Sequence, residues 1–510
     1  MKEQERRQTQ PELSEITDVD LVSEDIEELE STRVSKALLE EISAWKREAK
    51  SEDNDRYFWH VREVDQIARG DRYFVIGRKG SGKTAICEYL SRRQKFNVFA
   101  ERLSFKNFPF NELYSHSNSS YTPPNQFISI WKYLIYSTVC RLMVRNEAVD
   151  AEMRTKLAAL YDQGAPLSRR VGQWVGREFG ISLFGLSVKV TKERSAVPEN
   201  WIEYANYLED IIVGYSGDAA YFILFDELDE DYRDIIATEQ YKQYTALITS
   251  LFKAVQDIRS TFSGGRGPRL YPIIFLRDDI YDLIQDSDKN KWGDFRVDLN
   301  WDEAKIKKVM AFRISRAIDP TCDHPLGFGA AWDGVFGQLP MGVGRNKNKI
   351  STFEFISRST LLRPRDFVAY LQNCAQQALD QALDDQPKIS NNIVRRVDKA
   401  FSNYLREELT DELFAILPDI SAIFDTISQL RKWNFSVKEF ERAYSGQVHR
   451  GALKEKNVKF VLQILYLFDV IGNSPRVGRY VFHYKNREAR LNFNEQIVVH
   501  RGLFKALQIL

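Results

Sequence analysis

Residues 77–84 read GRKGSGKT and match G-x-x-x-x-G-K-[ST], a pattern that cradles nucleotide phosphates. They follow an apolar run at 73–76 and precede a helical pattern from 85, which is the context that this pattern requires. Inward-turned amides would surround phosphate oxygens, with the Lys83 ammonium on the β- and γ-phosphates and the Thr84 hydroxyl on Mg²⁺. The alternative is an ordinary glycine-rich turn. The predicted ATP-binding residues are Gly77, Arg78, Lys79, Gly80, Ser81, Gly82, Lys83, Thr84 and Ala85.

A second polar cluster follows the apolar run at 221–225, where residues 226–231 read DELDED. A buried strand that runs into carboxylates places them at the C-terminal edge of a sheet, where ligands of open α/β sheets bind. Asp226 is predicted to hold Mg²⁺ through water, and Glu227 to polarise the attacking water. We expect the strand of Asp226 to neighbour the strand of the phosphate loop. The three acids at 229–231 favour a simple helix cap.

The elements that must position these residues are short apolar strands alternating with helices. Continuous apolar runs at 73–76, 97–100, 221–225 and 273–276 predict strands with both faces covered, as in a parallel sheet between helices. The alternating run at 295–299 predicts a strand nearer an edge. From 302 to about 410 the pattern is helical, apart from a glycine-rich loop expected at 327–344. The predicted fold class is an α/β parallel-sheet P-loop fold with a helical lid.

Composition is that of a globular protein, because 43% of the 510 residues are hydrophobic and 28% are charged. No apolar run approaches the roughly 18 residues of a membrane span, and the start MKEQERRQTQ lacks the apolar core of a signal peptide. Four scattered cysteines favour reduced thiols, so we expect a cytoplasmic protein with no membrane contact. The cysteines are Cys87, Cys140, Cys322 and Cys374.

GRKGSGKT, the strand ending FDELDED, a later strand ending in Arg277 and the segment RPRDF together resemble the AAA+ superfamily of ATPases. The branch that looks most similar is shared by origin-recognition ATPases and STAND signalling ATPases. The resemblance covers roughly residues 55–385, and more loosely 410–510. It implies an ATP- and Mg²⁺-dependent ATPase of the AAA+ type.

The resemblance also implies roles for three arginines. Arg277 corresponds to sensor 1, between the acidic strand end and the γ-phosphate; a surface ion pair with Asp278 or Asp279 is the alternative. Arg365 corresponds to sensor 2 and is preferred over Arg363, because a cation in the first turn of a helix is unfavourable unless it meets an anion. A structural pair with Asp366 or a neighbouring acid is the alternative. AAA+ assemblies use an arginine from the adjacent subunit, which implies a homo-oligomer. Arg296 is the candidate, with Lys289 and Lys291 nearby.

The domain prediction has four parts: an acidic, disordered or loosely helical tail at 1–50, an ATPase core at 51–300 with an insertion at about 105–215, a lid at 301–408 and a basic domain at 409–510. Residues 1–32 carry eleven acids and three bases, whereas 431–510 carry fifteen bases and six acids. The insertion includes a hairpin expected at 181–190. It is a candidate surface for a protein partner.

The last hundred residues have the order helix, helix, strand, wing, strand, which resembles a winged helix. Ser436 and Glu439 predict a capping box. A second helix is expected from Val458 to about 471, and strands are expected at 476–485 and 491–493. The basic groups suited to DNA phosphates are Arg476, Arg479, Lys485, Arg487 and Arg490. Protein docking is the alternative use of such a domain.

These features lead to three functional hypotheses. The first is an ATP-hydrolysing molecular switch in bacterial anti-phage defence or signalling, with a separate effector protein because no nuclease, TIR or protease signature is evident. The second is an origin-recognition-like DNA-binding ATPase that acts as a loader or maintenance factor. The third is a nucleotide-binding scaffold with little turnover.

Overall fold

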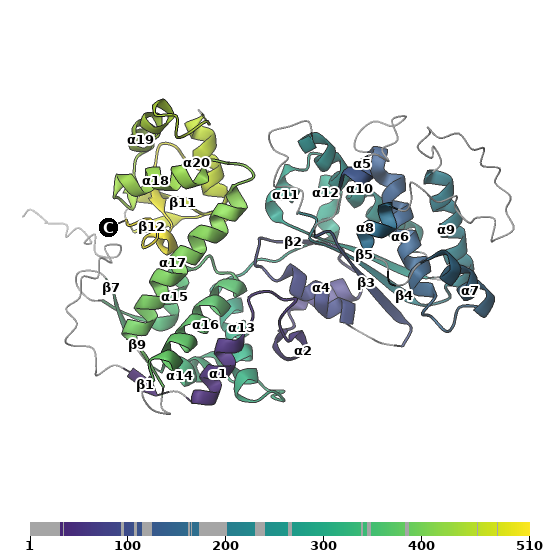
Figure 1. Ribbon diagram of the computed structural model, residues 1–510, viewed down its shortest axis with the longest axis horizontal. Helices are drawn as coiled ribbons and strands as arrows, with labels where there is room; N and C mark the ends of the chain where they lie inside the picture. Colours follow the sequence, from purple (N-terminus) through teal and green to yellow (C-terminus); the bar gives the residue numbers. More distant parts are fainter. Residues whose placement is uncertain are drawn as a thin grey trace, which may run out of the picture. The chain divides into compact units, whose positions relative to one another are not determined.

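The computed structural model describes residues 31–33, 35–92, 96–106, 110–114, 125–161, 164, 166–172, 201–229, 240–263, 268–337, 340–343, 348–382, 387–455, 457–476 and 478–509. The chain divides into two compact units, coloured by sequence in Figure 1. Unit 1 combines residues 1–47 with 301–510, and unit 2 is residues 48–300. Residues 1–30 of the predicted tail at 1–50, and the predicted hairpin at 181–190, lie outside the described residues.

The centre of unit 2 is a five-stranded parallel sheet in the order β3-β4-β5-β2-β6. All seven residues of β4 are buried, as expected for a continuous apolar strand covered on both faces. β6 lies at the edge, as its alternating sequence predicts. The prediction that β4 neighbours β2 is wrong, because β5 lies between them. The strands are β2 (Phe74–Ile76), β3 (Val98–Ser104), β4 (Ala220–Asp226), β5 (Arg269–Leu276) and β6 (Arg296–Asp298).

Helices cover both faces of this sheet (Figure 1). Helix α4 (Lys83–Arg92) lies on one face, against β3, β4 and β5. On the other face, α6 (Ile128–Met143) packs against β3 and β4, and α10 (Gln240–Thr261) packs against β5. The other helical segments are α2 (Asn54–Tyr57), α3 (Arg62–Ala68), α5 (Phe110–Tyr114), η2 (Asn125–Phe127), α7 (Ala151–Leu160), α8 (Leu167–Gly172), α9 (Trp201–Tyr215), α11 (Asp278–Leu283), α12 (Lys289–Trp292) and η6 (Gly293–Phe295).

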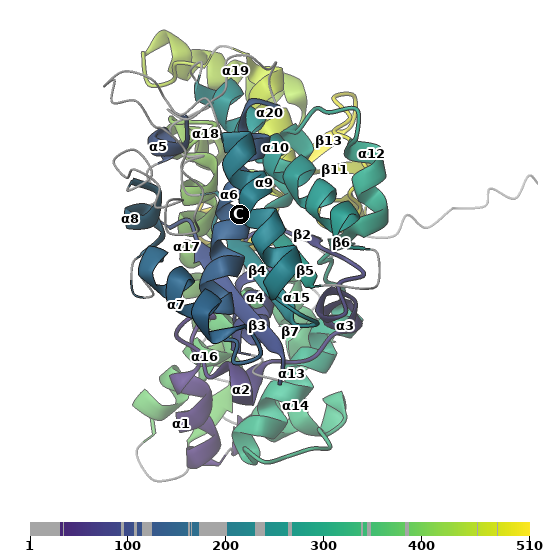
Figure 2. The same ribbon diagram turned by 90° about the vertical axis from the view of Figure 1, so that its right-hand side faces the viewer.

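Unit 1 begins with residues from the N-terminal end of the chain. Helix α1 (Lys36–Ala44) packs against α16 and α13, and it lies beside α16 in both views (Figures 1 and 2). Leu39 and Ile42 are fully buried, which explains why this short helix is fixed in place. β1 (Ser31–Arg33) pairs antiparallel with β9 (Lys388–Ser390). Within the predicted tail at 1–50, residues 36–44 therefore form a packed helix.

In the part that the structure describes, five helices and a short hairpin form the body of unit 1. The predicted loop at 327–344 is wrong in part, because α14 occupies 328–336 despite its glycines. The Trp332 and Phe336 rings are buried and stacked with centroids 4.7 Å apart, so burial outweighs the low helix propensity of glycine. The elements are α13 (Glu303–Ile318), α14 (Phe328–Phe336), β7 (Pro340–Val343), β8 (Asn348–Ser351), α15 (Thr352–Ser359), α16 (Pro364–Asp380) and α17 (Asn391–Leu413).

The C-terminal end of unit 1 has three helices and an antiparallel sheet of order β10-β13-β11-β12. The capping box of Ser436 and Glu439 is confirmed at the start of α19. The predicted helix from Val458 ends at Leu467 instead of 471, and the strands lie at 471–476, 479–481 and 496–499 instead of 476–485 and 491–493. The elements are α18 (Ile420–Leu430), β10 (Asn434–Phe435), α19 (Val437–His449), α20 (Val458–Leu467), β11 (Ile471–Arg476), β12 (Arg479–Val481), β13 (Gln496–Val499) and η7 (Arg501–Leu503).

Candidate functional site

The loop between β2 and α4 has a backbone that only its glycines adopt easily. Gly80 and Gly82 have φ values of +78° and +96°, in the left-handed region that disfavours residues with a Cβ. Helix α4 then starts directly at Lys83, so its N-terminal amides face the loop. A helix N-terminus with a glycine-rich loop before it favours an anionic group such as phosphate.

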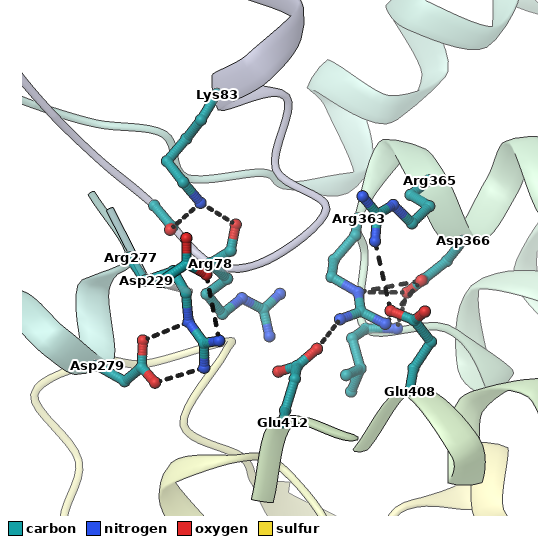
Figure 3. Close-up of polar contacts among 12 residues, drawn as sticks. Arg78, Lys83, Asp229, Arg277, Asp279, Arg363, Arg365, Asp366, Glu408 and Glu412 are labelled. Carbon is teal, nitrogen blue, oxygen red and sulfur yellow. Dashed lines mark hydrogen bonds and ion pairs between the residues drawn. The ribbon is translucent and has the colours of Figure 1, made fainter. Parts of the chain in front are cut away.

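Lys83 turns back toward this loop (Figure 3). Its Nζ donates hydrogen bonds to the carbonyl oxygens of Gly77, at 2.7 Å, and of Arg78, at 2.9 Å. Burial lowers the pKa of Lys83, while the carboxylates of Asp229 and Asp278 oppose that shift. The ammonium therefore lies at the mouth of the loop, where it suits a phosphate oxygen.

Asp226 ends β4 close to the start of α4. Its Oδ1 lies 3.5 Å from the Thr84 hydroxyl and accepts a hydrogen bond of 3.0 Å from the backbone amide of Glu227. Its Oδ2 lies 2.8 Å from Nη2 of Arg102. Asp226 is 2% exposed, and this burial raises its pKa, while the charge of Arg102 opposes the rise.

The next residue, Glu227, is surrounded by donors. Lys50 Nζ lies 2.7 Å from each of its carboxylate oxygens, Arg102 Nη2 lies 3.3 Å away, and the Ser104 hydroxyl donates a hydrogen bond. Burial favours the protonated form of Glu227, but the hydrogen bonds from Lys50 and Ser104 outweigh it and lower the pKa. Glu227 is thus held ionised, with a backbone φ of +61°.

The residues at this edge fit a magnesium ion bound together with phosphate. Thr84 and Asp226 converge through oxygen atoms, the ligand type that Mg²⁺ prefers. Within the described part of the chain, no three His, Cys, Asp or Glu side chains gather into a metal cluster. Mg²⁺ in nucleotide sites commonly uses one or two protein ligands together with water and substrate phosphates.

Arg277 follows β5 directly and faces two carboxylates (Figure 3). Its Nε and Nη2 lie 3.0 Å and 2.6 Å from the two oxygens of Asp279, a bidentate pair, and its Nη1 lies 3.5 Å from Asp229. The pair with Asp279 that the sequence offered as an alternative is therefore present, although Arg277 is buried and does not lie on the surface. β5 lies between β2 and β4 and runs parallel to both. Arg277 therefore lies at the C-terminal ends of the strands, as Lys83 and Asp226 do. Its role as sensor 1 stays a prediction.

The two arginines of RPRDF differ sharply in burial. Arg363 is 2% exposed, and it makes close ion pairs with Asp366, at 2.9 Å, and Glu412, at 3.2 Å. Burial lowers its pKa, but these two carboxylates outweigh burial and raise it. Arg365 keeps 25% of its side chain exposed and contacts Glu408 at 3.4 Å (Figure 3). Of the two, Arg365 retains the freedom to reach another anion, so the preference for it still holds as a prediction.

Arg296, the candidate for action across a subunit boundary, lies on the edge strand β6. It pairs with Asp298 at 3.0 Å and its guanidinium lies over the Tyr281 ring, 5.1 Å from the centroid. One third of its side chain, 34%, is exposed. An edge position suits contact with a second chain, but its action in trans stays a prediction.

The predicted basic residues of the C-terminal region surround one hairpin and the segment after it. Arg476 and Arg479 are partners across the β11–β12 hairpin, and both side chains are exposed. Lys485 and Arg490 are also exposed, and Arg487 is half-buried. Their positions fit a solvent-facing basic surface, and contact with DNA stays a prediction.

Three side chains of the site were missed from the sequence: Lys50, Arg102 and Ser104. Lys50 lies 177 residues from Glu227 in the chain, and nothing in its own segment indicates the contact. A signal existed for the other two, because β3 extends to Ser104 and the period of a strand places Arg102 and Ser104 on one face.

Comparisons with known proteins give matches to one family profile and to solved structures. A protein-family profile described as the FunZ-associated C-terminal helical domain matches residues 328–410, which span α14 to most of α17. The chain is similar to one from the structure of Drosophila ORC bound to DNA, with 11% identity over 100% of this chain and 96% of that chain, at a TM-score of 0.27. It is also similar to Cdc6p from Pyrobaculum aerophilum, with 10% identity over 94% and 97% of the chains, at a TM-score of 0.30. No curated protein matches.

At these low identities and TM-scores, neither solved structure defines an activity or a partner for this chain. The strand order and the helices on both faces show an α/β fold built on a parallel sheet, with a helical domain after it. The predicted α/β parallel-sheet class is confirmed, and its AAA+ type stays a prediction. Among the described residues, no helix combines the length and apolarity that crossing a membrane requires.

Proposed function

We propose that the protein is an ATP-hydrolysing molecular switch that depends on Mg²⁺. Lys83 and the amides of residues 77–84 bind the phosphates, Thr84 and Asp226 hold the metal, and Glu227 orients the attacking water. The observation that carries this proposal is the approach of Asp226 Oδ1 to the Thr84 hydroxyl, at 3.5 Å, with Glu227 directly after it. Bound Mg²⁺ neutralises charge on the phosphates during transfer.

Two variants of the full chain test this function. Lys83→Ala is expected to lose ATP binding, and Glu227→Gln to bind ATP but to release phosphate at least about 100-fold more slowly, because general bases contribute that much or more. Lys132→Ala is the control, because Lys132 pairs with Asp257 on the surface of unit 2, at 3.2 Å. If Lys83→Ala binds and hydrolyses ATP like the parent, the proposal is wrong. If the parent binds ATP without turnover, the scaffold hypothesis replaces it.

The switch is proposed to act through nucleotide sensing and assembly. Arg277 and Arg365 are the candidate sensors, and Arg296 is the candidate that acts on a neighbouring subunit of a homo-oligomer. The edge position and partial exposure of Arg296 support this assignment. Mass measurement with and without ATP should show a larger assembly with ATP, and Arg296→Gln should retain ATP binding in its own site while lowering turnover. A monomer in both conditions contradicts the assembly proposal.

The pathway proposed is bacterial anti-phage defence or signalling with a separate effector protein. Its support is the resemblance of the arginine after β5 to STAND ATPases. Co-purification from cells that express the neighbouring genes, with and without Glu227→Gln to hold ATP, is the test. An effector that binds only the ATP-held form supports a switch, and binding that ignores the nucleotide contradicts it.

A second candidate function is DNA binding by a winged-helix-like C-terminal region. The exposed arginines of the β11–β12 hairpin favour it, because exposed cations suit phosphate contacts. Replacing Arg476 and Arg479 by Gln should reduce the salt dependence of duplex binding by a slope of about 2 in log–log form. The control with the same charge change replaces Arg396 and Lys399, which are exposed on α17. Equal losses in both variants contradict a specific DNA surface.

A further inference from the structure

Arg102 is a guanidinium held among three carboxylates. It lies on β3, with 15% of its side chain exposed. It pairs closely with Glu88 of α4, and its Nη2 lies 2.8 Å from Asp226 Oδ2 and 3.3 Å from Glu227 Oε2. No feature of the nucleotide-binding motifs accounts for this residue.

The contact with Arg102 divides the two oxygens of Asp226 between separate partners. Oδ2 lies within ion-pair distance of Arg102, at 2.8 Å, whereas Oδ1 faces the Thr84 hydroxyl and the amide of Glu227. A carboxylate free to rotate about its terminal torsion would exchange these two oxygens. An ion pair at Oδ2 favours the orientation in which Oδ1 faces Thr84.

The Arg102 guanidinium also counters the repulsion between the carboxylates of Asp226 and Glu227. Asp226 and Glu227 are adjacent in sequence, and Asp226 is almost fully buried, so their carboxylates repel each other in poorly solvated surroundings. A planar guanidinium with five donors in a fixed fork can bridge several carboxylates at once, whereas an ammonium acts as a point charge. Arginine is thus the side chain that fits the spacing seen here.

We propose that Arg102 is a positioning residue for the metal-binding carboxylate: it fixes Asp226 so that Oδ1 and the Thr84 hydroxyl together receive Mg²⁺ with the nucleotide. This inference rests on the proposed function. The competing explanation is a structural strut that joins β3, α4 and the end of β4. A structural contact stabilises the fold with and without magnesium. A positioning residue instead affects only the binding of nucleotide that depends on Mg²⁺.

The test measures the affinity of the full chain for a fluorescent ATP analogue, with Mg²⁺ and with EDTA. The parent is expected to bind more tightly with Mg²⁺. Arg102→Gln should weaken the Mg²⁺-dependent affinity by about 10- to 100-fold, the usual cost of removing a group that orients a metal ligand, and should leave the affinity in EDTA within about twofold. Arg102→Lys keeps the charge but loses the fork, so it should give an intermediate loss.

The matched control is Arg92→Gln. Arg92 lies 3.7 Å from the same Glu88 but has 45% of its side chain exposed. The Arg92→Gln variant should bind the ATP analogue as tightly as the parent, both with Mg²⁺ and with EDTA. Equal losses with Mg²⁺ and with EDTA for Arg102→Gln overturn the proposal in favour of a strut. If Arg102→Gln does not fold, Arg102→Lys decides: an unchanged response to Mg²⁺ overturns the proposal, and a selective loss supports it.

Failure of the proposed function gives a different result. In that case the parent binds the analogue no better than Lys83→Ala, or gains nothing from Mg²⁺, and both proposals fall together. If the parent needs Lys83 and Mg²⁺ but Arg102→Gln keeps the full gain, only the role of Arg102 is overturned.

Discussion

Lys50 and Glu227 form the contact with the clearest consequence for the chemistry of a single residue. A general base must accept a proton from water, yet both oxygens of Glu227 lie 2.7 Å from an ammonium. The ion pair keeps Glu227 ionised and at the same time restrains it. Loosening of this pair is therefore a step that we expect before Glu227 acts on water.

Lys50→Met should change the pH dependence of ATP turnover. Without the ammonium, burial raises the pKa of Glu227 again, so the acid limb of the rate profile should move to higher pH. At pH 8 the Lys50→Met variant should hydrolyse ATP up to about fivefold faster than the parent. The limit follows because a partly exposed ion pair contributes at most about 1 kcal/mol. Lys132→Met, which breaks the comparable pair with Asp257, is the control. An unchanged profile would show that Lys50 does not restrain the base.

Substitutions of Arg363 and Arg365 should differ in their effects: one lowers the free energy of unfolding, and the other lowers ATP turnover. Arg363→Gln leaves Asp366 and Glu412 without their buried counter-charge, which should cost about 3–5 kcal/mol of unfolding free energy. Arg365→Gln removes a partly exposed contact and should cost less than about 0.5 kcal/mol while lowering ATP turnover. Urea denaturation and phosphate release, measured on both variants, check the two effects. Equal stabilities of the two variants would contradict the burial argument.

At the scale of elements, the start of α19 depends on an ionised side chain. Hydrogen bonds from Lys432 and from the amide and hydroxyl of Ser436 hold the pKa of Glu439 at about 2, below its ordinary 4.5. A lowered pKa in the folded state stabilises the fold above about pH 4.5, and this stabilisation is lost as the pH falls toward 2.

Glu439→Gln should therefore cost about 1 kcal/mol at pH 7, the usual value of a cap on a side chain as exposed as this one. The difference between parent and variant should shrink as the pH falls from 4.5 toward 2. Urea denaturation across this range measures it, with Glu441→Gln on the same helix as the control. A difference that stays constant with pH would contradict a charge-dependent cap.

The elements that the sequence predicts well are those whose signal is local. The strand and helix around residues 77–84 follow from their own apolar runs, and the capping box follows from four consecutive residues. Helix α14 was missed because its glycines mark a loop locally, whereas the stacked Trp332 and Phe336 rings that hold it are buried only in the folded unit.

The site itself was predictable only in part, for the same reason. Lys83, Thr84, Asp226 and Glu227 belong to patterns of consecutive residues. The contacts of Ser104 and Lys50 with Glu227 join residues 123 and 177 positions apart, so they follow from the packing of β3 and of the segment before α2. The strand period indicates only that Ser104 shares a face of β3 with Arg102, and a single sequence carries no direct signal of either contact with Glu227.

At the scale of the whole molecule, the two units should respond separately to core substitutions. Leu39→Ala removes a fully buried side chain from α1 and should cost unit 1 about 2–5 kcal/mol. Hydrogen exchange should become faster in α16, which packs on α1, and stay unchanged in β4 and β5. Leu90→Ala in α4 is the reciprocal control and should give the opposite pattern. Uniform changes across both units would contradict their independence.

Unit 1 is built from two separate parts of the sequence, with unit 2 between them. During translation, α1 is therefore synthesised long before the rest of unit 1. About 320 residues separate the end of α1 from the start of its partner α16, so a translating ribosome needs roughly 15 to 65 s to connect them. Unit 2 is complete within that interval and is free to fold first, since domains generally fold as units. The apolar side of α1, with Leu39 and Ile42, therefore waits in the nascent chain until its binding surface has been synthesised, and during this wait it is a natural target for chaperones.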